Sequence, residues 1–366
     1  MYIRLFTLFF LLSHLAVVAQ SNQSAKLETV AEFGKHQPIG LGVSRAAPSC
    51  RDRIFVTFPK NAESYDYGLA EIIDGKRRPY PTAQWNQWDS LNPQNRFINV
   101  QALFVDQTNA LWVLDPASPA GMKAMPEGIK LLKINLATNA VEKIYRFEDL
   151  PRNRTGLNDV QVDTRRQMAY LSDPGRAAIV VLDLASGKSR TVLENDTSTK
   201  ADPNFVLTID GKDVRDTQGN PFKSNVNGIA LTHDFRYLYF RPITQTKLFR
   251  IATEYLANPA LTATKLASHV EAMGETGVSH GMIADKAGNV YLTDSPDKSI
   301  RYFTPAGQLK TLVQDNRLLW PDSFGIGSDG YLYVTAAQIH RTRRYNSGAD
   351  KVDYPFRLYR VKLPTP

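Results

Sequence analysis

The chain has 366 residues, of which 43% are hydrophobic and 22% are charged, and its formal net charge is +8. This composition is ordinary for a soluble globular protein. Basic residues are scattered among acidic ones, which argues against nucleic acid as a partner. A single cysteine rules out an internal disulfide. We therefore consider a soluble enzyme, a small-molecule binding protein and a non-enzymatic interaction platform.

Residues 1–19 have the features of a secretory signal peptide. Arg4 lies in a short N-terminal region, an apolar run covers residues 5–18, and small residues precede Gln20. The run is too short to span a bilayer, and no later run approaches that length. We therefore predict a mature domain of residues 20–366 that is secreted or periplasmic, has no membrane span and is monomeric.

The first predicted element of the mature chain is a strand at residues 26–33 (KLETVAEF), where apolar and polar residues alternate. We expect it to pair with residues 356–363 (FRLYRVKL), near the other end of the chain. Such a pairing would complete the last blade of a closed ring and remove the open edges of its sheets.

Between these two segments one pattern recurs, in units that start near residues 40, 99, 158, 227, 280 and 322. In the last five units a polar residue precedes an apolar strand, and an aromatic residue follows the polar one by 11 to 13 positions. A turn with an acidic residue lies between them. The five opening residues are Asn99, Asn158, Asn227, His280 and Asp322.

These short strands cannot bury both faces alone and must stack on copies of themselves. The unit spacing is near or above that of propeller repeats. We therefore predict an all-β protein, a six-bladed β-propeller whose N-terminal strand closes the last blade. In this scheme Asn227-Gly228 forms a turn that leads into a strand at residues 229–231.

Two stretches exceed what a blade needs. Residues 60–98 include RRPYPTAQWNQWD, which predicts an extended, aromatic-rich insertion lying across a surface. Residues 195–225 carry turn signals around VLTID, which predict an inserted hairpin. Long loops at one mouth of a rigid ring are where specificity usually resides.

The segments RRPYPTAQWNQWD, LNDVQVD, NGIALTHDFRYLYFRPITQTKLFRI and WPDSFGIGSDGYLYV resemble the yellow and major royal jelly protein family. The resemblance covers nearly all of the mature chain. Within the wider six-bladed superfamily the chain is also similar to lactonases of the gluconolactonase and senescence-marker type. Insect members generally contain disulfides, so this chain looks more like a bacterial yellow-like relative.

The resemblance implies a secreted propeller with a ligand site at the mouth of the central channel. Some insect members are associated with dopachrome conversion, and others bind biogenic amines. Because the first strand of each propeller blade lines the channel, we expect the five opening residues to converge at one mouth. The predicted ligand-binding residues are Asn99, Asn158, Asp159, Asn227, Arg241 and Ser323.

We predict His280 and Asp322 as the catalytic pair. The imidazole would act as a general acid or base or as a hydrogen-bond donor, and a neighbouring Asp322 would orient it and raise its pKa. By contrast, aspartates that follow the blade aromatic residues by three positions are expected to stabilise strand-exit turns. They are Asp115, Asp173 and Asp294.

The lactonase resemblance implies a divalent cation held by a glutamate, two asparagines and an aspartate. Asn158 and Asn227 match the two asparagines, but His280 stands in place of the aspartate and residues 37–42 contain no glutamate. Calcium prefers six or more oxygen ligands and carboxylate charge. We therefore predict no metal cofactor, with a cation such as calcium on Asn158 and Asn227 as the alternative.

Three functions stay open at this point. The first is binding of a small polar or aromatic ligand at the channel mouth, with metal-free isomerisation of a quinone-like substrate if the protein is a catalyst. The second is a divalent-metal-dependent lactonase. The third is a binding protein without enzymatic activity. The sequence does not decide whether the protein is an enzyme.

Overall fold

The computed structural model describes residues 25–44, 51–60, 65–119, 122 and 124–364. The predicted signal peptide lies outside these residues. Within them, no helix is both long enough and apolar enough to cross a membrane.

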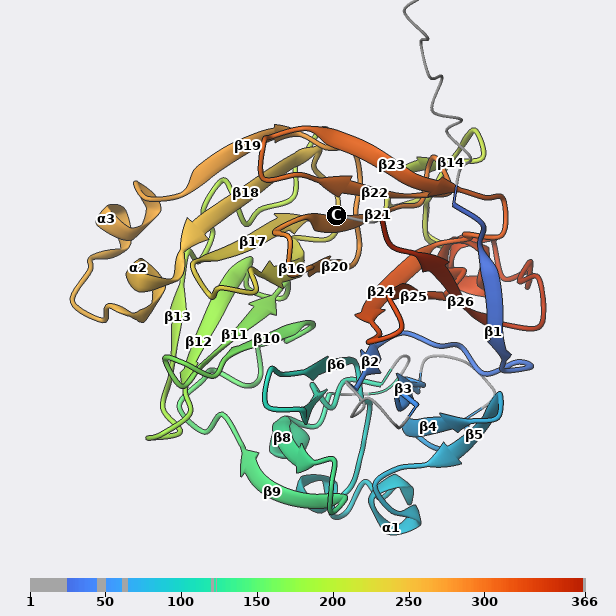
Figure 1. Cartoon of the computed structure of the whole chain (residues 1–366), viewed down its shortest axis with the longest axis horizontal. Helices are drawn as coiled ribbons and strands as arrows, with labels where there is room; N and C mark the ends of the chain where they lie inside the picture. The colour runs from blue at the N-terminus through green and yellow to red at the C-terminus, as the bar shows by residue number, and fades with distance from the viewer. Residues whose placement is uncertain (1–24, 45–50, 61–64, 120–121, 123, 365–366) are drawn as a thin grey trace, which may run out of the picture.

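Six four-stranded antiparallel sheets are arranged in a ring (Figure 1), and their inner strands line its central channel. Blade 1 contains β2 (Leu41–Val43), β3 (Ile54–Thr57), β4 (Leu69–Ile73) and β5 (Lys76–Pro79). Blade 2 contains β6 (Ala102–Val105), β7 (Ala110–Asp115), β8 (Lys130–Asn135) and β9 (Ala140–Tyr145). Blade 3 contains β10 (Val160–Asp163), β11 (Met168–Asp173), β12 (Ala178–Asp183) and β13 (Ser189–Val192).

Blade 4 contains β16 (Val226–Leu231), β17 (Tyr237–Pro242), β18 (Lys247–Ala252) and β19 (Glu271–Glu275). Blade 5 contains β20 (Met282–Ala284), β21 (Val290–Asp294), β22 (Ser299–Phe303) and β23 (Leu309–Gln314). Blade 6 contains β24 (Pro321–Ile326), β25 (Tyr331–Ala336), β26 (Arg357–Lys362) and the N-terminal β1 (Glu28–Glu32). The predicted six-bladed propeller is confirmed.

The ring is closed by the two ends of the chain, as predicted. Strand β1 is the outermost strand of blade 6 and pairs antiparallel with β26. Two ion pairs reinforce this pairing: Glu28 with Arg360 at 2.9 Å and Glu32 with Arg357 at 3.2 Å. Both pairs are partly exposed to solvent, so the backbone ladder and the apolar side chains beneath it contribute more to closure than the charges do.

The hydrophobic core lies between the blades. Each repeated aromatic residue packs in a cluster shared with the following blade, as Tyr170 does with blade 4 and Tyr291 with blade 6. The acidic residue of the preceding turn accepts a hydrogen bond from the ring in several blades. Trp112 Nε1 donates to Asp106 at 2.8 Å, and the Tyr291 hydroxyl donates to Asp285 at 2.9 Å. The aromatic residue that recurs in the sequence is therefore the residue that packs against the next blade.

Glycines allow the inner strands of neighbouring blades to approach closely. A Cβ atom on Gly228 would lie 2.5 Å from the His280 carbonyl oxygen, and one on Gly281 would lie 1.7 Å from that of Asp322. Neither glycine has a positive φ. Their role is therefore the close backbone contact that brings adjacent strands together around the channel.

The structure corrects the predicted turn at Asn227-Gly228. Both residues lie inside β16, where the pairing register shifts between Val226 and Ile229. Strand β24 has the same irregularity between Pro321 and Phe324. Bulges of this kind redirect side chains next to functional sites. The turn prediction was wrong because an Asn-Gly pair also suits a bulge at a crowded blade contact.

The stretch 60–98 is not wholly an insertion, because it supplies β4 and β5 of blade 1. It continues into the short helix α1 (Ala83–Asn86) and the 3-10 turn η1 (Pro93–Asn95). Trp85 and Trp88 pack against blades 1, 2 and 3 and take no part in the channel mouth.

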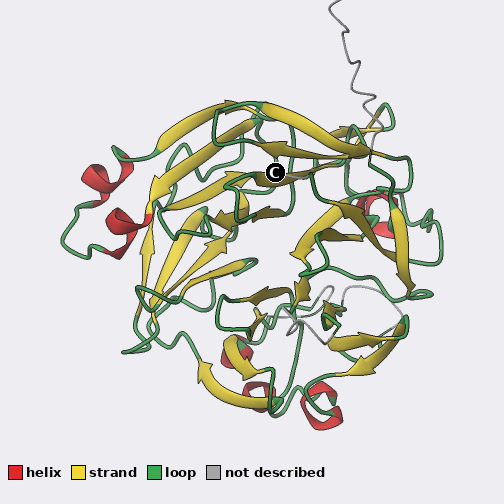
Figure 2. Ribbon diagram, viewed as in Figure 1, coloured by secondary structure: helices red, strands yellow, loops and turns green. Residues whose placement is uncertain are grey.

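Residues 195–225 include the hairpin of β14 (Thr208–Ile209) and β15 (Lys212–Asp213). Helices α2 (Thr253–Ala257) and α3 (Ala263–Ala267) lie at the outer edge of blade 4 (Figure 2). Further 3-10 turns are η2 (Pro126–Gly128), η3 (Ile339–Arg341) and η4 (Arg343–Tyr345).

Substituting Gly281→Ala should destabilise the ring. The new methyl group would overlap the Asp322 carbonyl, and overpacking against backbone costs about 1–3 kcal/mol or more. Urea unfolding should therefore show a lower midpoint. Gly156→Ala is the matched control, because its nearest contact of 3.4 Å is ordinary packing and its φ is not positive. Equal midpoints for the two variants would contradict the close-approach role of Gly281.

Candidate functional site

The strand register places five polar residues at corresponding positions around the channel. In blade 3, Tyr170 pairs with Gln161, three residues after Asn158. The aromatic residues of blades 4, 5 and 6 likewise pair with the third residue after the opening residue. In blade 2, Trp112 pairs with Phe104, so the corresponding position is Gln101. The ring is therefore Gln101, Asn158, Asn227, His280 and Asp322, all of which line one cavity.

Asn99, predicted as a ligand-binding residue, does not line this cavity. Its side-chain amide donates to the Ser118 carbonyl at 2.9 Å, and its oxygen accepts the Lys60 N–H at 2.6 Å. These bonds hold loops at the edge of blade 2. The spacing contains the signal that identifies Gln101: it precedes Trp112 by 11 residues, as His280 precedes Tyr291.

We call the space lined by this ring the mouth cavity. Its volume is about 410 Å³, and the 195–225 segment and residues around η3 and η4 complete its wall. Trp320 packs with Phe222 at a ring-centroid distance of 5.3 Å, and Phe222 contacts Tyr345 at 5.9 Å. The sequence reasoning missed these aromatic wall residues, because they come from three segments far apart in the chain.

The amide side chains of the ring form a hydrogen-bonded series across three blades. Gln101 Nε2 donates to Asn158 Oδ1 at 3.3 Å, and Asn158 Nδ2 donates to Asn227 Oδ1 at 3.0 Å. This series fixes the orientation of Asn158 between its neighbours. It leaves the Asn227 amide nitrogen at the cavity end of the series as a donor for a ligand.

His280 is buried and neutral. Its Nε2 lies 2.6 Å from Ser295 Oγ, and its ring stacks on Trp320 with centroids 4.1 Å apart. Its Nδ1 is buried without a hydrogen-bond partner among the described residues. Burial, aided by the positive charge of Arg241, lowers the pKa of His280 to about 3.

This environment corrects the prediction that Asp322 raises the pKa of His280. The recorded partner of the imidazole is Ser295, and desolvation outweighs any attraction from a nearby carboxylate. His280 therefore stays uncharged at neutral pH and is suited to hydrogen bonding rather than to accepting a proton.

Asp322 is the titratable group of the mouth cavity whose pKa lies nearest to neutrality. Burial raises the pKa of Asp322 to about 6, partly offset by hydrogen bonds from Ser323 and Trp320. The Ser323 hydroxyl donates to Asp322 Oδ1 at 3.3 Å. Both the acid and the carboxylate forms are therefore accessible near neutral pH, as proton transfer requires.

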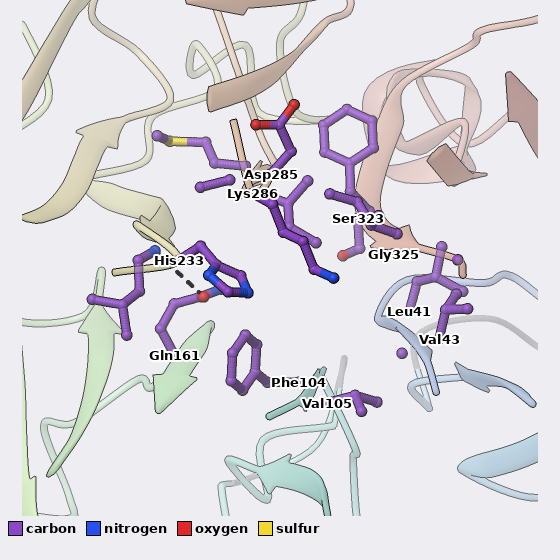
Figure 3. Close-up of a pocket in the computed structure, with 18 of the residues that line it drawn as sticks. Leu41, Val43, Phe104, Val105, Gln161, His233, Asp285, Lys286, Ser323 and Gly325 are labelled. Atoms are coloured by element: carbon purple, nitrogen blue, oxygen red, sulfur yellow. Dashed lines mark hydrogen bonds between the residues drawn. The ribbon is translucent and has the colours of Figure 1, made fainter. Parts of the chain in front are cut away.

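Asp159 and Ser323, predicted to share the mouth, instead line a second cavity of about 600 Å³ (Figure 3). Asp159 accepts the backbone N–H groups of Val160 at 2.8 Å and Ile229 at 3.3 Å. Burial raises the pKa of Asp159 to about 7, and the negative charge of Asp322 adds to the shift. The channel thus contains two distinct cavities, one lined by Asp159 and the other by Asp322.

Arg241, predicted to face an anionic ligand, is fully buried and lines neither cavity. Its guanidinium donates to Thr276 Oγ1 at 2.7 Å and to the Gln245 carbonyl at 2.6 Å, and it also bonds the Gly277 carbonyl. Burial lowers the pKa of Arg241 to about 10. The N–H groups of Arg241 therefore donate hydrogen bonds to neighbouring loops. In blades 2 and 3 an aspartate carboxylate at the corresponding position accepts hydrogen bonds from loop N–H groups instead.

The corresponding aspartates have the expected structural role. Asp115 accepts the N–H groups of Ile98 at 2.7 Å and Asn99 at 2.9 Å and pairs with the buried Lys130 at 3.0 Å. Asp173 accepts the Gly156 N–H at 2.9 Å. These carboxylates hold the loops that lead into the inner strands.

The mouth cavity does not suit a divalent cation. Its ring offers amides, one imidazole and one carboxylate, and the described residues contain no cluster of three or more His, Cys, Asp or Glu side chains placed to hold a metal. The oxygens of Asn158 and Asn227 already accept amide protons. Calcium normally takes six to eight oxygens, with carboxylate charge to offset its desolvation.

The fold and the site together define a six-bladed propeller with a polar, aromatic-walled cavity at one mouth of its channel. The sequence model of the Major royal jelly protein family matches residues 98–365. The chain therefore belongs to the major royal jelly protein family, as the sequence motifs predicted.

Two Apis mellifera proteins are similar to this chain. Major royal jelly protein 3 is 23% identical over 57% of this chain and 39% of its own length. Major royal jelly protein 1 is 24% identical over 56% of this chain and 48% of its own length. The chain thus matches less than half the length of either relative.

Solved structures of similar fold include a putative gluconolactonase, with a TM-score of 0.53, 12% identity and coverage of 93% of this chain and 92% of the other. A luciferin-regenerating enzyme has a TM-score of 0.52 and 14% identity, covering 92% and 95% of the two chains. Regucalcin from Agrobacterium tumefaciens, a calcium-binding protein, has a TM-score of 0.52 and 12% identity over 92% and 96%. At these identities the likeness shows the fold alone.

Replacing Asp322 by Asn should stabilise the protein in a pH-dependent way. Because the folded-state pKa of about 6 exceeds the ordinary aspartate pKa of 3.8, the folded protein holds this proton more tightly than the unfolded chain does. Wild-type stability relative to the variant should therefore fall as pH rises from about 4 to 6 and level off above that range. We expect a change of about 1–3 kcal/mol.

Chemical denaturation of both proteins between pH 4 and pH 8 measures this difference. Asp74→Asn, an exposed turn position, is the control and should show no comparable pH dependence. A stability difference that stays constant with pH would contradict the burial of an ionisable carboxyl at residue 322.

Proposed function

We propose that this protein binds a small polar aromatic molecule in the mouth cavity, and that Asp322 moves a proton on that molecule. The observation that carries the proposal is the group of aromatic rings that line the mouth cavity together with Asp322, namely Phe222, Trp320 and Tyr345. The Phe222 ring lies 5.3 Å from Trp320 and 5.9 Å from Tyr345, between centroids. This arrangement supplies an aromatic wall next to a carboxyl group of near-neutral pKa.

The size and chemistry of the cavity support a ligand of this class. A volume of about 410 Å³ falls within the range of small-molecule sites, which combine apolar walls with a few polar groups. Aromatic rings favour offset-stacked or edge-to-face contacts with one another. The amide series and the imidazole provide hydrogen bonds to hydroxyl or carbonyl groups of a bound ring.

Isomerisation of a quinone-like substrate suits these groups without a metal. The reaction moves a proton from one position of the substrate to another and needs no oxidant or reductant. The Asp322 carboxylate would take the proton from carbon and return it at the second position. The neutral His280 would donate a hydrogen bond to the oxygen on which negative charge develops. With the predicted signal peptide, we propose that this chemistry takes place outside the cytoplasm.

Binding and turnover are separable in this site. Titration with a catechol, L-dopa, followed by calorimetry should show binding to the wild type. Trp320→Leu should weaken it about tenfold, since an aromatic contact and its buried area are lost. Asp322→Asn should change catechol affinity less than about threefold but lower the rate of dopachrome isomerisation at least a hundredfold, the usual contribution of a general acid–base group.

His233→Ala is the control, because His233 lines the other cavity. It should leave catechol binding unchanged. Binding without turnover would make the protein a non-catalytic carrier, while catechol affinity that is insensitive to Trp320→Leu would exclude the mouth cavity as the site.

A calcium titration tests the lactonase alternative. Because the donor set does not suit the cation, we expect the melting temperature to stay constant up to millimolar calcium. A ligand present at a hundred times its Kd would stabilise the folded state by about 2.7 kcal/mol, a shift of several degrees. A shift of this size that Asn158→Leu abolishes would support the divalent-metal-dependent lactonase instead.

A further inference from the structure

The second cavity, of about 600 Å³, opens at the end of the channel away from the mouth cavity. We call it the lower cavity. Inner strands of all six blades contribute to its wall, and most of the wall is apolar. Its apolar side chains include Leu41, Val43, Phe104, Val105, Ile283 and Ile326. Figure 3 shows Phe104 and Val105 along the lower side of the cavity and Leu41 and Val43 along its right side.

The polar groups at the inner end of the lower cavity already have partners. Asp159 accepts two backbone N–H groups, and Gln161 Oε1 accepts the Leu231 N–H at 3.4 Å. Ser323 donates to Asp322. Because their hydrogen-bonding capacity is largely met by protein, these residues do not require polar groups on a ligand. The cavity therefore favours an apolar body.

Positive charge gathers at the outer rim. Lys286 lines the cavity and projects across its centre in Figure 3, and Lys362 lines the wall beside blade 6. The acidic neighbour Asp285 is engaged by its own hairpin: it accepts from the Asn289 N–H, the Asn289 side chain and Tyr291. The ammonium group of Lys286 therefore faces the opening without a competing carboxylate partner from that hairpin.

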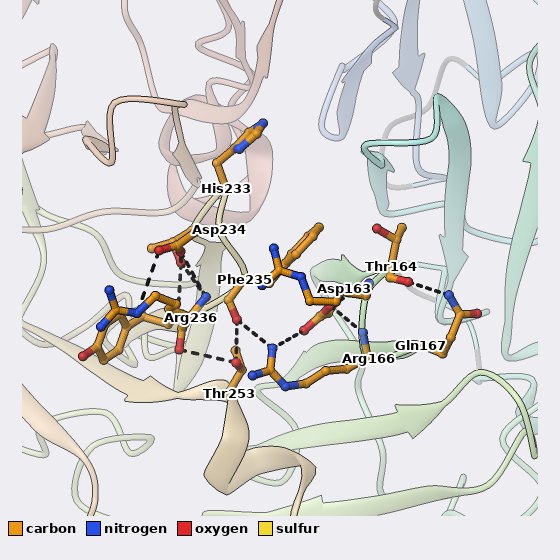
Figure 4. A network of polar contacts seen from close by, with 12 residues as sticks. Asp163, Thr164, Arg166, Gln167, His233, Asp234, Phe235, Arg236 and Thr253 are labelled. Carbon is orange, nitrogen blue, oxygen red and sulfur yellow. Dashed lines mark hydrogen bonds and ion pairs between the residues drawn. The ribbon is translucent and has the colours of Figure 1, made fainter.

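The rim at blades 3 and 4 is held in place by a polar network (Figure 4). Arg166 bonds Asp163 at 3.0 Å and the Phe235 carbonyl at 3.2 Å, which joins the turns of blades 3 and 4. Gln107 donates to the His233 carbonyl at 2.6 Å. These bonds fix the turn that carries His233 at the cavity edge, so the opening is preorganised.

From this geometry we propose that the lower cavity is a second binding site, for an amphipathic monocarboxylate whose apolar chain fills the channel and whose carboxylate pairs with Lys286. Volume, apolar walls and rim charge are complementary to such a molecule. The site is separate from the mouth cavity, which is lined by a ring of polar side chains, so the two ends of one channel suit different ligands.

Dodecanoate is the probe that tests this proposal. Dodecanol and dodecylamine are the matched analogues, which have the same chain length but an uncharged or a cationic head group. Calorimetric titration should show that dodecanoate binds more tightly than either analogue. Lys286→Gln should weaken dodecanoate about three- to fivefold, the scale of an exposed ion pair, and leave dodecanol unchanged. Lys310→Gln, an exposed lysine of the same blade, is the control and should change neither.

A blocking variant tests the apolar channel itself. Ala284→Phe adds a ring on the cavity wall and should abolish binding of both dodecanoate and dodecanol. If it does not fold, as judged by its melting curve, Val105→Gln introduces a polar side chain into the wall and should weaken both probes. Catechol binding at the mouth cavity should persist in each folded variant, which separates this site from the proposed function.

Three results would overturn the proposal. They are the absence of dodecanoate binding, dodecylamine binding at least as tight as dodecanoate, and dodecanoate affinity that is unaffected by the blocking variants. The second result would assign the site to a cation held by Asp159, and the third would place the probe elsewhere on the protein.

Discussion

The architecture depends on the contact that each blade makes with the next. A repeated aromatic residue on the second strand packs into the following blade, and its polar atom often bonds an acidic residue in the preceding turn. No single sheet can bury both of its faces, so these contacts stabilise the ring only when it closes. Closure by β1 and β26 therefore supports every interblade cluster and not blade 6 alone.

Close backbone contacts at Gly228 and Gly281 bring the inner strands of neighbouring blades together around the candidate site. They set the His280 and Asp322 carbonyls against the neighbouring strand, which fixes the side chains on the channel. The cost is electrostatic, because a carboxyl group held there is removed from bulk water. The raised pKa values of Asp159 and Asp322, about 7 and about 6, are the result. The burial that disfavours their charged forms also brings their pKa values close to neutrality, where a carboxyl group can exchange protons.

The sequence predicted the blades well because the repeat is local: an aromatic residue and a turn acid lie within one hairpin. It failed where position depends on distant parts of the chain. Asn99 was chosen over Gln101 because both are polar residues before the same strand; the 11-residue spacing to Trp112 favours Gln101, and the pairing of Trp112 with Phe104 confirms that register. Asp159 and Ser323 were assigned to the mouth because a sequence does not show on which side of a channel a side chain lies. Trp320 was missed because its partners come from residues 195–225 and 339–345.

The two carboxyl groups also connect the two cavities. Asp159 lines the lower cavity and Asp322 the mouth cavity, yet the negative charge of Asp322 raises the pKa of Asp159. A ligand that changes the protonation of one group must therefore change the proton affinity of the other, and this coupling is reciprocal. An uncharged ligand next to Asp322 that favours its neutral form would make Asp159 easier to ionise. The channel is thus one electrostatic unit although its two ends have different walls.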